Sequence, residues 1–349
     1  MSTISTLTHQ PFWQKTEDYH TAGEPFRIVH QLPPGILTPN LTVSQQRLSI
    51  ITTPSHPLDL LRQSLCHEPR GHADMYGGFI TPPDDTGAHF GVLFFHKDGF
   101  STACGHGTIA LGYWAVAHGI VERRPGGTVD VMVDVPSGRV TAIVTFDDGG
   151  DVVCVDFVNV LSHQISSGDE VSIDWDGEVM PLKMDLAFAG AVYACVDVWD
   201  LDLSVEPSQH QKFIDIARKI KSRRPGFLYR DKYDIYGVCF FEHQDESDDA
   251  VMQKNAVVFA DGQIDRSPCG SGTCARLAVL LAEGRVSKEK GLVHESIVGS
   301  KFEAHVMETV DSKPFPSCVP RVRGTARLIG RMEFYIDPTD PIYPGFVLR

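Results

Sequence analysis

A short cysteine-glycine turn occurs twice in this 349-residue chain, and the repetition constrains the fold more than any other feature of the sequence. The first copy, ACGHGTIA, starts at Ala103, and the second, PCGSGTCA, starts at Pro268. Each copy places a cysteine, Cys104 or Cys269, before the pattern Gly-x-Gly-Thr. The cysteines lie 165 positions apart, so each half of the chain carries one copy.

The repeat extends beyond the turn. An Ala/Leu-rich stretch follows each cysteine and ends at Gly119 or Gly284, both 15 residues after their cysteine, where the glycine after a helix usually stands. Upstream, each copy has an apolar strand, 92–95 or 256–259, and then an Asp-Gly turn. Glycine-rich turns before helices also arise by chance, but chance does not explain matches at fixed offsets. The sequence therefore predicts an internal duplication that produces two similar domains.

Length and patterning agree with two domains, because 349 residues exceed what one hydrophobic core usually holds. Most apolar runs are short, bounded by turn residues and typical of strands. They are residues 129–135, 139–146, 152–160, 191–198 and 255–259.

Charge and the N-terminal residues bear on location and partners. The formal net charge of −14 argues against a nucleic-acid or anionic-membrane partner, although a pocket can still be locally positive for a small anion. The N-terminal residues lack the pattern of a secretory signal, and no stretch has the length of a membrane span. Eight cysteines over this length make no dense disulfide framework, so we expect reduced thiols and a cytoplasmic protein.

The repeated turn suits acid–base chemistry by a thiol. Unpaired N–H groups and the dipole at a helix start favour a thiolate, so the sequence predicts lowered pKa values for Cys104 and Cys269. The bare amides of the same turns could hold a substrate carboxylate. Inversion of a carbon centre with an acidic C–H needs a base on one face and an acid on the other. Two like thiols, supplied by one duplicated turn, meet that requirement.

The sequence resembles the proline racemase family, which includes proline racemases, 4-hydroxyproline epimerases and trans-3-hydroxy-L-proline dehydratases. The segments that carry the resemblance span nearly the whole chain. They are YHTAGEPFRIV at Tyr19, HEPRGHADMYGG at His67, CGHGTIALG at Cys104, DRSPCGSGT at Asp265 and HESIVGSKF at His294.

The resemblance implies an α/β (α+β) fold like that of diaminopimelate epimerase. It has two pseudo-symmetric domains, each a curved, mostly antiparallel sheet around a central helix, with the active site in the cleft between them. We expect residues 1–175 and a returning segment 335–349 to form the first domain, and residues 176–334 to form the second. The resemblance also implies no cofactor and no metal. A homodimer is compatible with it, although nothing in the sequence shows one.

The resemblance also implies roles for particular residues. Cys104 and Cys269 would be the acid/base pair, and His106 and Asp265 would hydrogen-bond the ring nitrogen of proline or hydroxyproline. The remaining expected contacts are the backbone amides around Gly105, His106, Gly270 and Ser271 for the carboxylate, and Tyr76, Cys239 and Phe259 around the ring. Without the motif, His106 would read as a structural histidine and Asp265 as a turn residue.

Position 269 separates the activities within the family. Dehydratases typically carry threonine there, whereas this chain has Cys269, which favours a proline racemase. The segment at His67, however, is more similar to the eukaryotic dehydratase branch. Dehydration of trans-3-hydroxy-L-proline and 2-epimerisation of 4-hydroxyproline therefore stay open as alternatives.

Other classes of function explain fewer features of the sequence. A cysteine hydrolase needs one nucleophile and leaves the second turn unexplained, and a non-catalytic binding module would have no need of two intact thiols. The cluster of Cys66, His67 and His72 does not form a zinc helix, because the histidine spacing is wrong and Pro69 would break the helix. Cys154, Cys195 and Cys274 lie in apolar patterns typical of inert buried cysteines.

Overall fold

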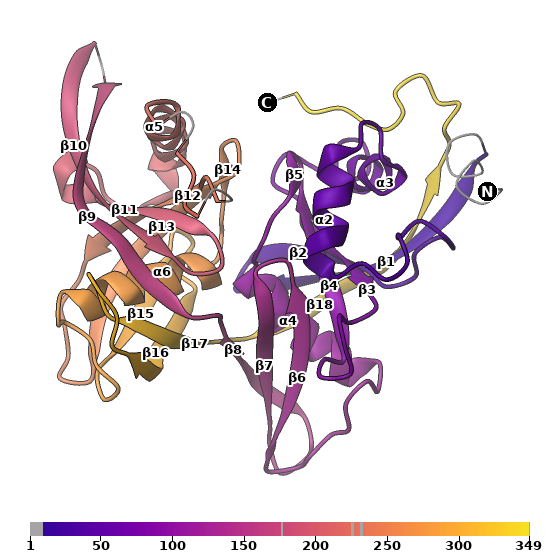
Figure 1. The fold of residues 1–349 in the computed structure, drawn as a ribbon, viewed down its shortest axis with the longest axis horizontal. Coiled ribbons are helices and arrows are strands. Elements are labelled where there is room, and N and C mark those ends of the chain that lie inside the picture. The colour runs from indigo at the N-terminus through magenta and orange to yellow at the C-terminus, as the bar shows by residue number, and fades with distance from the viewer. Residues whose placement is uncertain (1–9, 176, 225–226, 231–232, 349) are drawn as a thin grey trace. The chain divides into compact units, whose positions relative to one another are not determined.

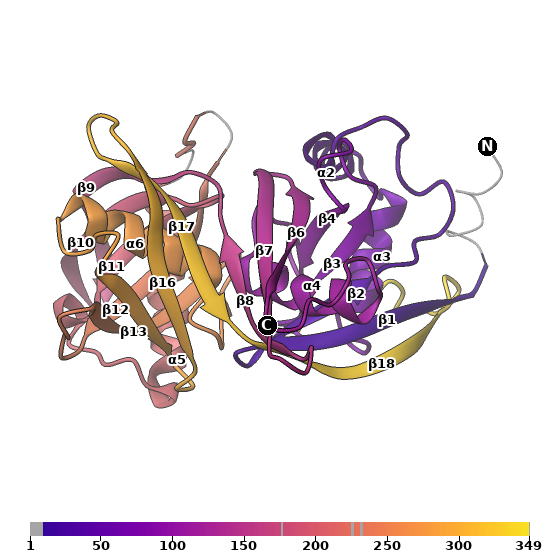
Figure 2. The same cartoon turned by 90° about the horizontal axis from the view of Figure 1, so that it is seen from below.

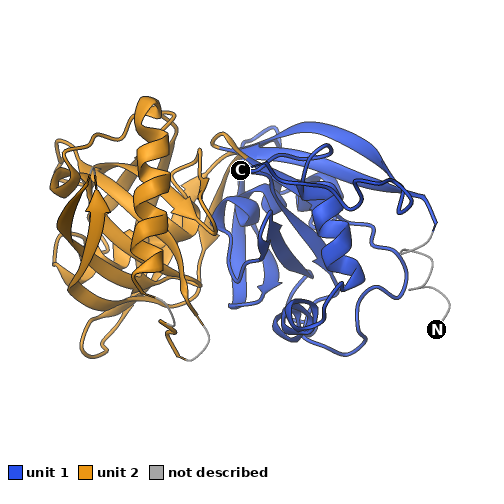
Figure 3. Ribbon diagram, turned by 90° about the horizontal axis from the view of Figure 1, so that it is seen from above, with its two compact units in different colours: residues 1–21, 25–152, 326–349 blue, residues 22–24, 153–325 orange. Residues whose placement is uncertain are grey.

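The computed structural model describes residues 10–175, 177–224, 227–230 and 233–348, and these residues form two compact units. The described residues among 1–21, 25–152 and 326–349 make up unit 1, and those among 22–24 and 153–325 make up unit 2 (Figure 3). In each unit the strands pair among themselves around a buried helix of that unit. Among the described residues, every helix is too short or too polar to cross a bilayer.

The division differs from the expected one at two places. Residues 153–175 belong to unit 2 rather than to the first domain, because strands β8 (Val152–Val158) and β9 (Ser162–Trp175) pair with other strands of unit 2. The last strand, β18 (Ala326–Ile336), belongs to unit 1 over its whole length, because it pairs with β1 (Phe12–Thr21) from end to end (Figure 1). The return to unit 1 thus starts at residue 326 and not at 335.

Unit 1 is a curved, mostly antiparallel sheet with helices on both faces. In addition to β1 and β18, it contains β2 (Glu24–Val29), α2 (Val43–Thr52), α3 (Pro57–Cys66), β3 (Tyr76–Thr81), β4 (Phe90–His96), β5 (Gly99–Phe100), α4 (Gly105–Ala117), β6 (Thr128–Val135) and β7 (Gly138–Phe146). Strand β2 runs parallel to β3, β3 is antiparallel to β4, β4 is parallel to β6, and β6 is antiparallel to β7.

Unit 2 repeats this pairing pattern. In addition to β8 and β9, it contains β10 (Glu178–Phe188), β11 (Val192–Asp197), η1 (Val198–Leu201), η2 (Pro207–Gln209), α5 (His210–Ser222), β12 (Ile235–His243), β13 (Ala250–Phe259), β14 (Gln263–Ile264), α6 (Gly270–Ala282), β15 (Gly291–Ser296), β16 (Lys301–Val310) and β17 (Ser317–Gly324). Strand β11 is parallel to β12, β12 antiparallel to β13, β13 parallel to β15, and β15 antiparallel to β16. The predicted duplication and fold class are therefore confirmed.

The sheet of unit 2 closes on itself around α6. Strand β17 pairs with β16 on one side and with β9 on the other, and β9 leads through β10 back to β11. Helix α6 contacts strands from β9 to β17 and lies inside this ring (Figure 2). All its residues from Gly270 to Leu280 are buried, which explains why small and apolar residues lie on every side of this helix rather than along one stripe.

Further helices cover the face of each unit's strands that lies away from the buried helix. In unit 2, Phe213, Ile216 and Ile220 of α5 are fully buried against the sheet. Burial of each such side chain stabilises the unit by about 1.5–3 kcal/mol. In unit 1, α2 and α3 cover the sheet in the same way, with Leu58 and Leu65 fully buried.

Candidate functional site

Cys104 caps the N-terminus of α4, the buried helix of unit 1. Its Sγ accepts a hydrogen bond from the Gly107 N–H at 3.2 Å, and its carbonyl accepts from the Thr108 hydroxyl at 2.8 Å. The backbone of Cys104 is extended, with φ −156° and ψ 108°. The side chain is buried, and its Sγ lies 3.5 Å from His106 Nδ1. The first thiol therefore stands at a helix start, as the sequence predicts.

Cys269 caps α6 in unit 2 with the same contact. Its Sγ accepts from the Gly272 N–H at 3.3 Å, and its carbonyl accepts from the Thr273 N–H at 2.8 Å. Its backbone differs, because φ is +60°. Helices α4 and α6 both have 13 residues and are both followed, after one capping residue, by a glycine with positive φ, Gly119 or Gly284. These two helix ends are as predicted.

The second glycine of each turn makes room for the thiol. A Cβ at Gly107 would lie 2.8 Å from Cys104 Sγ and 2.5 Å from the ring of Phe26. A Cβ at Gly272 would lie 3.1 Å from Cys269 Sγ. The second glycine of the Gly-x-Gly pattern therefore follows from the approach of sulfur to the amide three residues ahead.

The pKa of Cys269 departs from the prediction. Burial, followed by the charge of Asp265, raises the pKa of Cys269 well above its ordinary value, whereas the Gly272 N–H lowers it. The helix start alone predicts a lowered pKa, but removing a thiolate from water costs more than one amide hydrogen bond returns. Cys269 is thus held as a neutral thiol at neutral pH.

Asp265 lies just before α6, and its carboxylate is linked to the turn. Its Oδ1 accepts from both the backbone N–H and the hydroxyl of Ser267, at 2.8 and 2.7 Å, and Ser267 Oγ accepts from the Cys269 N–H at 3.1 Å. Burial raises the pKa of Asp265 to about 6, and the two bonds from Ser267 oppose this shift. The carboxylate is therefore ionised at neutral pH.

His106, the second residue of α4, is buried and uncharged. Burial lowers its pKa to about 3, although a hydrogen bond to the Pro25 carbonyl opposes the shift. The rings of Tyr76 and Phe26 meet the imidazole edge to face, at centroid distances of 5.0 and 5.8 Å. An imidazole with this pKa can donate or accept a hydrogen bond but carries no charge above pH about 4.

The residues expected to surround a ring lie on strands next to these turns. In unit 1, Tyr76 starts β3 and hydrogen-bonds Ser101 through its hydroxyl. In unit 2, Cys239 on β12 pairs with Val257 on β13, and Gly237 pairs with Phe259 two positions away, so Cys239 and Phe259 share one face of the sheet. Within each unit, the predicted residues therefore gather around the helix start.

The structure adds contacts that the sequence did not indicate. Tyr193 on β11 places its hydroxyl 3.9 Å from Cys269 Sγ, and Ser267 bridges Asp265 to the turn. Ser267 follows Asp265 by two positions, a spacing typical of a turn bond, and could have been found. Tyr193 lies far from Cys269 in sequence and gave no such signal. The Oγ of Ser271 is buried and has no hydrogen-bond partner among the described residues.

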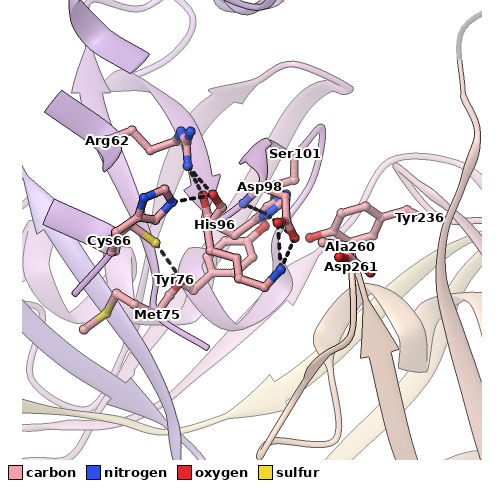
Figure 4. A network of polar contacts seen from close by, with 12 residues as sticks. Arg62, Cys66, Met75, Tyr76, His96, Asp98, Ser101, Tyr236, Ala260 and Asp261 are labelled. Atoms are coloured by element: carbon pink, nitrogen blue, oxygen red, sulfur yellow. Dashed lines mark hydrogen bonds and ion pairs between the residues drawn. The ribbon is translucent and has the colours of Figure 1, made fainter. Parts of the chain in front are cut away.

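The residues weighed as a metal cluster have other partners in unit 1. The Cys66 thiol donates to the Met75 carbonyl at 3.2 Å, and His67 Nε2 lies 2.7 Å from the Lys97 carbonyl. Arg62 donates to the carbonyls of His96 and Lys97, which closes a polar network beside Tyr76 (Figure 4). Within the described part of the chain, no group of histidine, cysteine and carboxylate side chains is arranged to hold a metal ion. All eight cysteines are described, and none forms a disulfide.

Comparison with known proteins gives one consistent result. A family model described as proline racemase matches residues 17–347. The chain is 36% identical over 336 residues to a trans-3-hydroxy-L-proline dehydratase of Colwellia psychrerythraea, covering 95% of this chain and 91% of that one. It is 33% identical over 340 residues to the proline racemase of Clostridioides difficile, covering 95% and 97%. The crystal structure of a hydroxyproline epimerase from Agrobacterium vitis with bound trans-4-hydroxy-L-proline superposes with a TM-score of 0.83, at 26% identity and 96% coverage of both chains.

Proposed function

Because the chain belongs to the proline racemase family, we propose that it is a cofactor-independent proline racemase that uses Cys104 and Cys269 as its acid/base pair. One observation supports this proposal above the others. Each cysteine caps a buried helix through the same Sγ-to-amide contact, in two units with the same strand pairing. Like groups are what a reaction needs when its reverse swaps the acid and the base.

The two thiols take different roles in the proposed cycle. Burial and Asp265 raise the pKa of Cys269, so Cys269 enters as the thiol and donates a proton to Cα. Cys104 is then the base that removes the α-proton from the opposite face. The C–H bond to Cys104 breaks, the C–H bond from Cys269 forms, and the configuration inverts. Return of each cysteine to its starting state completes the turnover.

The remaining side chains bind the substrate in this proposal. Asp265 is ionised at neutral pH and pairs with the ring ammonium, while neutral His106 hydrogen-bonds the same nitrogen. The first amides of the two helices hold the carboxylate, and the helix dipoles favour the negative charge. These amides belong to Gly105, His106, Gly270 and Ser271. Tyr76, Cys239 and Phe259 surround the carbon atoms of the ring.

The test is turnover in deuterium oxide. The purified protein is incubated separately with L-proline, trans-4-hydroxy-L-proline and trans-3-hydroxy-L-proline, and the products are separated by chiral chromatography. We expect D-proline from L-proline, with one solvent deuterium at Cα. Inversion of trans-4-hydroxy-L-proline alone would identify a 4-hydroxyproline 2-epimerase. Absence of inversion and of α-deuteration with every substrate would overturn the proposal.

Dehydration of trans-3-hydroxy-L-proline is the second candidate, and the relative from Colwellia psychrerythraea favours it. In that reaction one thiolate removes the α-proton, the 3-hydroxyl leaves as water, and the product is pyrroline-2-carboxylate. Cys269 stands where the dehydratases that the chain resembles typically have threonine, so we place this activity second. Formation of pyrroline-2-carboxylate without inversion of any substrate would reverse the order.

A further inference from the structure

The peptide group before Cys269 is held by two buried side chains. The Pro268 carbonyl accepts a hydrogen bond from Asn255 Nδ2 at 2.6 Å and is 2.9 Å from the Thr273 hydroxyl. Cys269, the next residue, has a φ of +60°, which residues other than glycine seldom adopt. Such a conformation persists only where the surrounding contacts enforce it. Asn255 and Thr273 supply such contacts at the preceding peptide group.

His294 lies behind both of these side chains. Its Nδ1 is 2.9 Å from Thr273 Oγ1 and 3.1 Å from Asn255 Nδ2, and its Nε2 is 3.3 Å from Gln253 Oε1. The imidazole is fully buried on β15. It has no contact with Cys269 among the described hydrogen bonds, so any effect on the thiol passes through Asn255 and Thr273.

The donors and acceptors around His294 determine where its proton lies. Arg276 can only donate, and its Nε donates to Gln253 Oε1 at 3.2 Å, which identifies that atom as the amide oxygen. Gln253 Oε1 can only accept, so His294 Nε2 carries the hydrogen. Burial lowers the pKa of His294 to about 3, so the ring has one proton and Nδ1 has none. The bare Nδ1 therefore accepts from its neighbours.

The acceptor at Nδ1 determines the hydrogen bonds that Asn255 and Thr273 can donate. Asn255 Nδ2 has two hydrogens, one for the Pro268 carbonyl and one for His294 Nδ1. The single hydroxyl hydrogen of Thr273 points to one of the same two acceptors. Removal of the acceptor at Nδ1 would leave an amide hydrogen unpaired and release both side chains from one orientation.

We propose that His294 is a positioning residue whose unprotonated Nδ1 orients Asn255 and Thr273, and through them the Pro268–Cys269 peptide and the direction of the Cys269 thiol. This inference rests on the proposed function for its catalytic consequence, but its effect on the thiol can be measured without any turnover. It assigns the HES motif at His294 a task in the chemistry of a cysteine 25 residues upstream.

The experiment compares two amide substitutions of the histidine. In His294→Asn the amide oxygen stands where Nδ1 lies and can accept the same hydrogen bonds, whereas in His294→Gln the amide reaches the Nε2 position and leaves Nδ1 without a substitute. We expect H294Q to lower kcat about tenfold to a hundredfold with little change in KM, since a displaced reacting group costs rate rather than binding. H294N should retain most of kcat.

Thiol reactivity gives a second readout that loss of stability would not imitate. Cys104 and Cys269 are alkylated with iodoacetamide across a range of pH, and each rate is followed by peptide mass spectrometry. In H294Q the rate or the pH profile of Cys269 should shift while Cys104 stays as in the wild type. Ile216→Val, in the core of unit 2 and away from this network, serves as the control for lost stability and should change neither cysteine.

A second pair of variants tests the same inference if H294Q does not fold. Thr273→Val removes the hydroxyl and should act in the same direction as H294Q, whereas Thr273→Ser keeps the hydroxyl and should resemble the wild type. Wild-type alkylation of Cys269 in H294Q or T273V, or equal changes at both cysteines, would overturn the inference. If the wild type inverts no proline, the proposed function fails, and the alkylation rates still decide the role of His294.

Discussion

The two cysteine turns share their local design and differ in what surrounds them. In both, the thiol caps a 13-residue buried helix and accepts the amide hydrogen three residues ahead. Cys104 has an extended backbone, whereas Cys269 has a φ of +60°. Beside Cys104 stands a neutral imidazole, and beside Cys269 stands a buried carboxylate linked through Ser267. Duplication therefore kept the capped thiol, while the neighbours of the two thiols diverged.

This difference in surroundings bears on the protonation state of the second thiol. Cys269 is kept as a thiol by burial and by the charge of Asp265. His106, beside Cys104, carries no charge at neutral pH. In the proposed reaction, Cys269 is therefore the acid before substrate arrives.

The largest expected effect comes from removing either thiol. Cys104→Ala and Cys269→Ala should each reduce proline inversion by about 10²–10⁴-fold, the usual contribution of one proton-transferring side chain. Chiral chromatography of D-proline measures it. Cys274→Ala, in the helix that Cys269 caps and fully buried, is the matched control and should retain activity. Full inversion by C269A would contradict the proposal that both thiols take part in the reaction.

The second-largest effect is expected at Asp265, the carboxylate that stands beside the second turn and has no counterpart beside the first. Because burial raises the pKa of Asp265 to about 6, its carboxyl is protonated below that pH and ionised above it. We expect kcat/KM for proline to fall as the pH drops through about 6, and Asp265→Asn to be slow at every pH and to lack this acidic limb. A pH–rate profile from pH 5 to 9 measures both. An unchanged limb in D265N would assign the titration to another group.

A smaller effect is expected when the second glycine of each turn is replaced by alanine, because the two glycines are crowded to different degrees. Gly107→Ala would place a Cβ 2.5 Å from the ring of Phe26, whereas Gly272→Ala would place one 3.2 Å from Val257. We expect G107A to lose about 1–3 kcal/mol in the free energy of unfolding, as overpacked cores do, and G272A to lose less. Urea denaturation of both variants measures the difference. Equal losses would show that the two turns are equally crowded.

The smallest effect is expected from replacing the glycine that follows each buried helix, and the loss of stability should be the same in both units. Gly119 and Gly284 follow the two helices with φ of +64° and +70°, and a Cβ at either would meet nothing within 4 Å. Alanine at each position should therefore cost only the backbone strain, about 1 kcal/mol in the free energy of unfolding. Urea denaturation should give equal losses with proline turnover unchanged. Unequal losses would mean that the helix ends have diverged as well.

Much of this architecture was predictable because its signals are local. The capped helix starts, the glycines after the helices and the repeated strand–turn–helix order all depend on residues close together in the chain. The domain boundaries were placed less well, because β8, β9 and β18 look alike as isolated strands. Their partners lie as far away as β17 and β1, and only the pairing assigns them to a unit.

The sequence by itself determined that two thiols stand at two equivalent helix starts, since capping and helix termination act over a few residues. Only the tertiary structure decided how those thiols differ. The raised pKa of Cys269 depends on burial and on the charge of Asp265, and the support of its strained backbone depends on Asn255 and His294. Desolvation and buried hydrogen bonds are properties of side chains brought together from distant strands, and no local pattern records them.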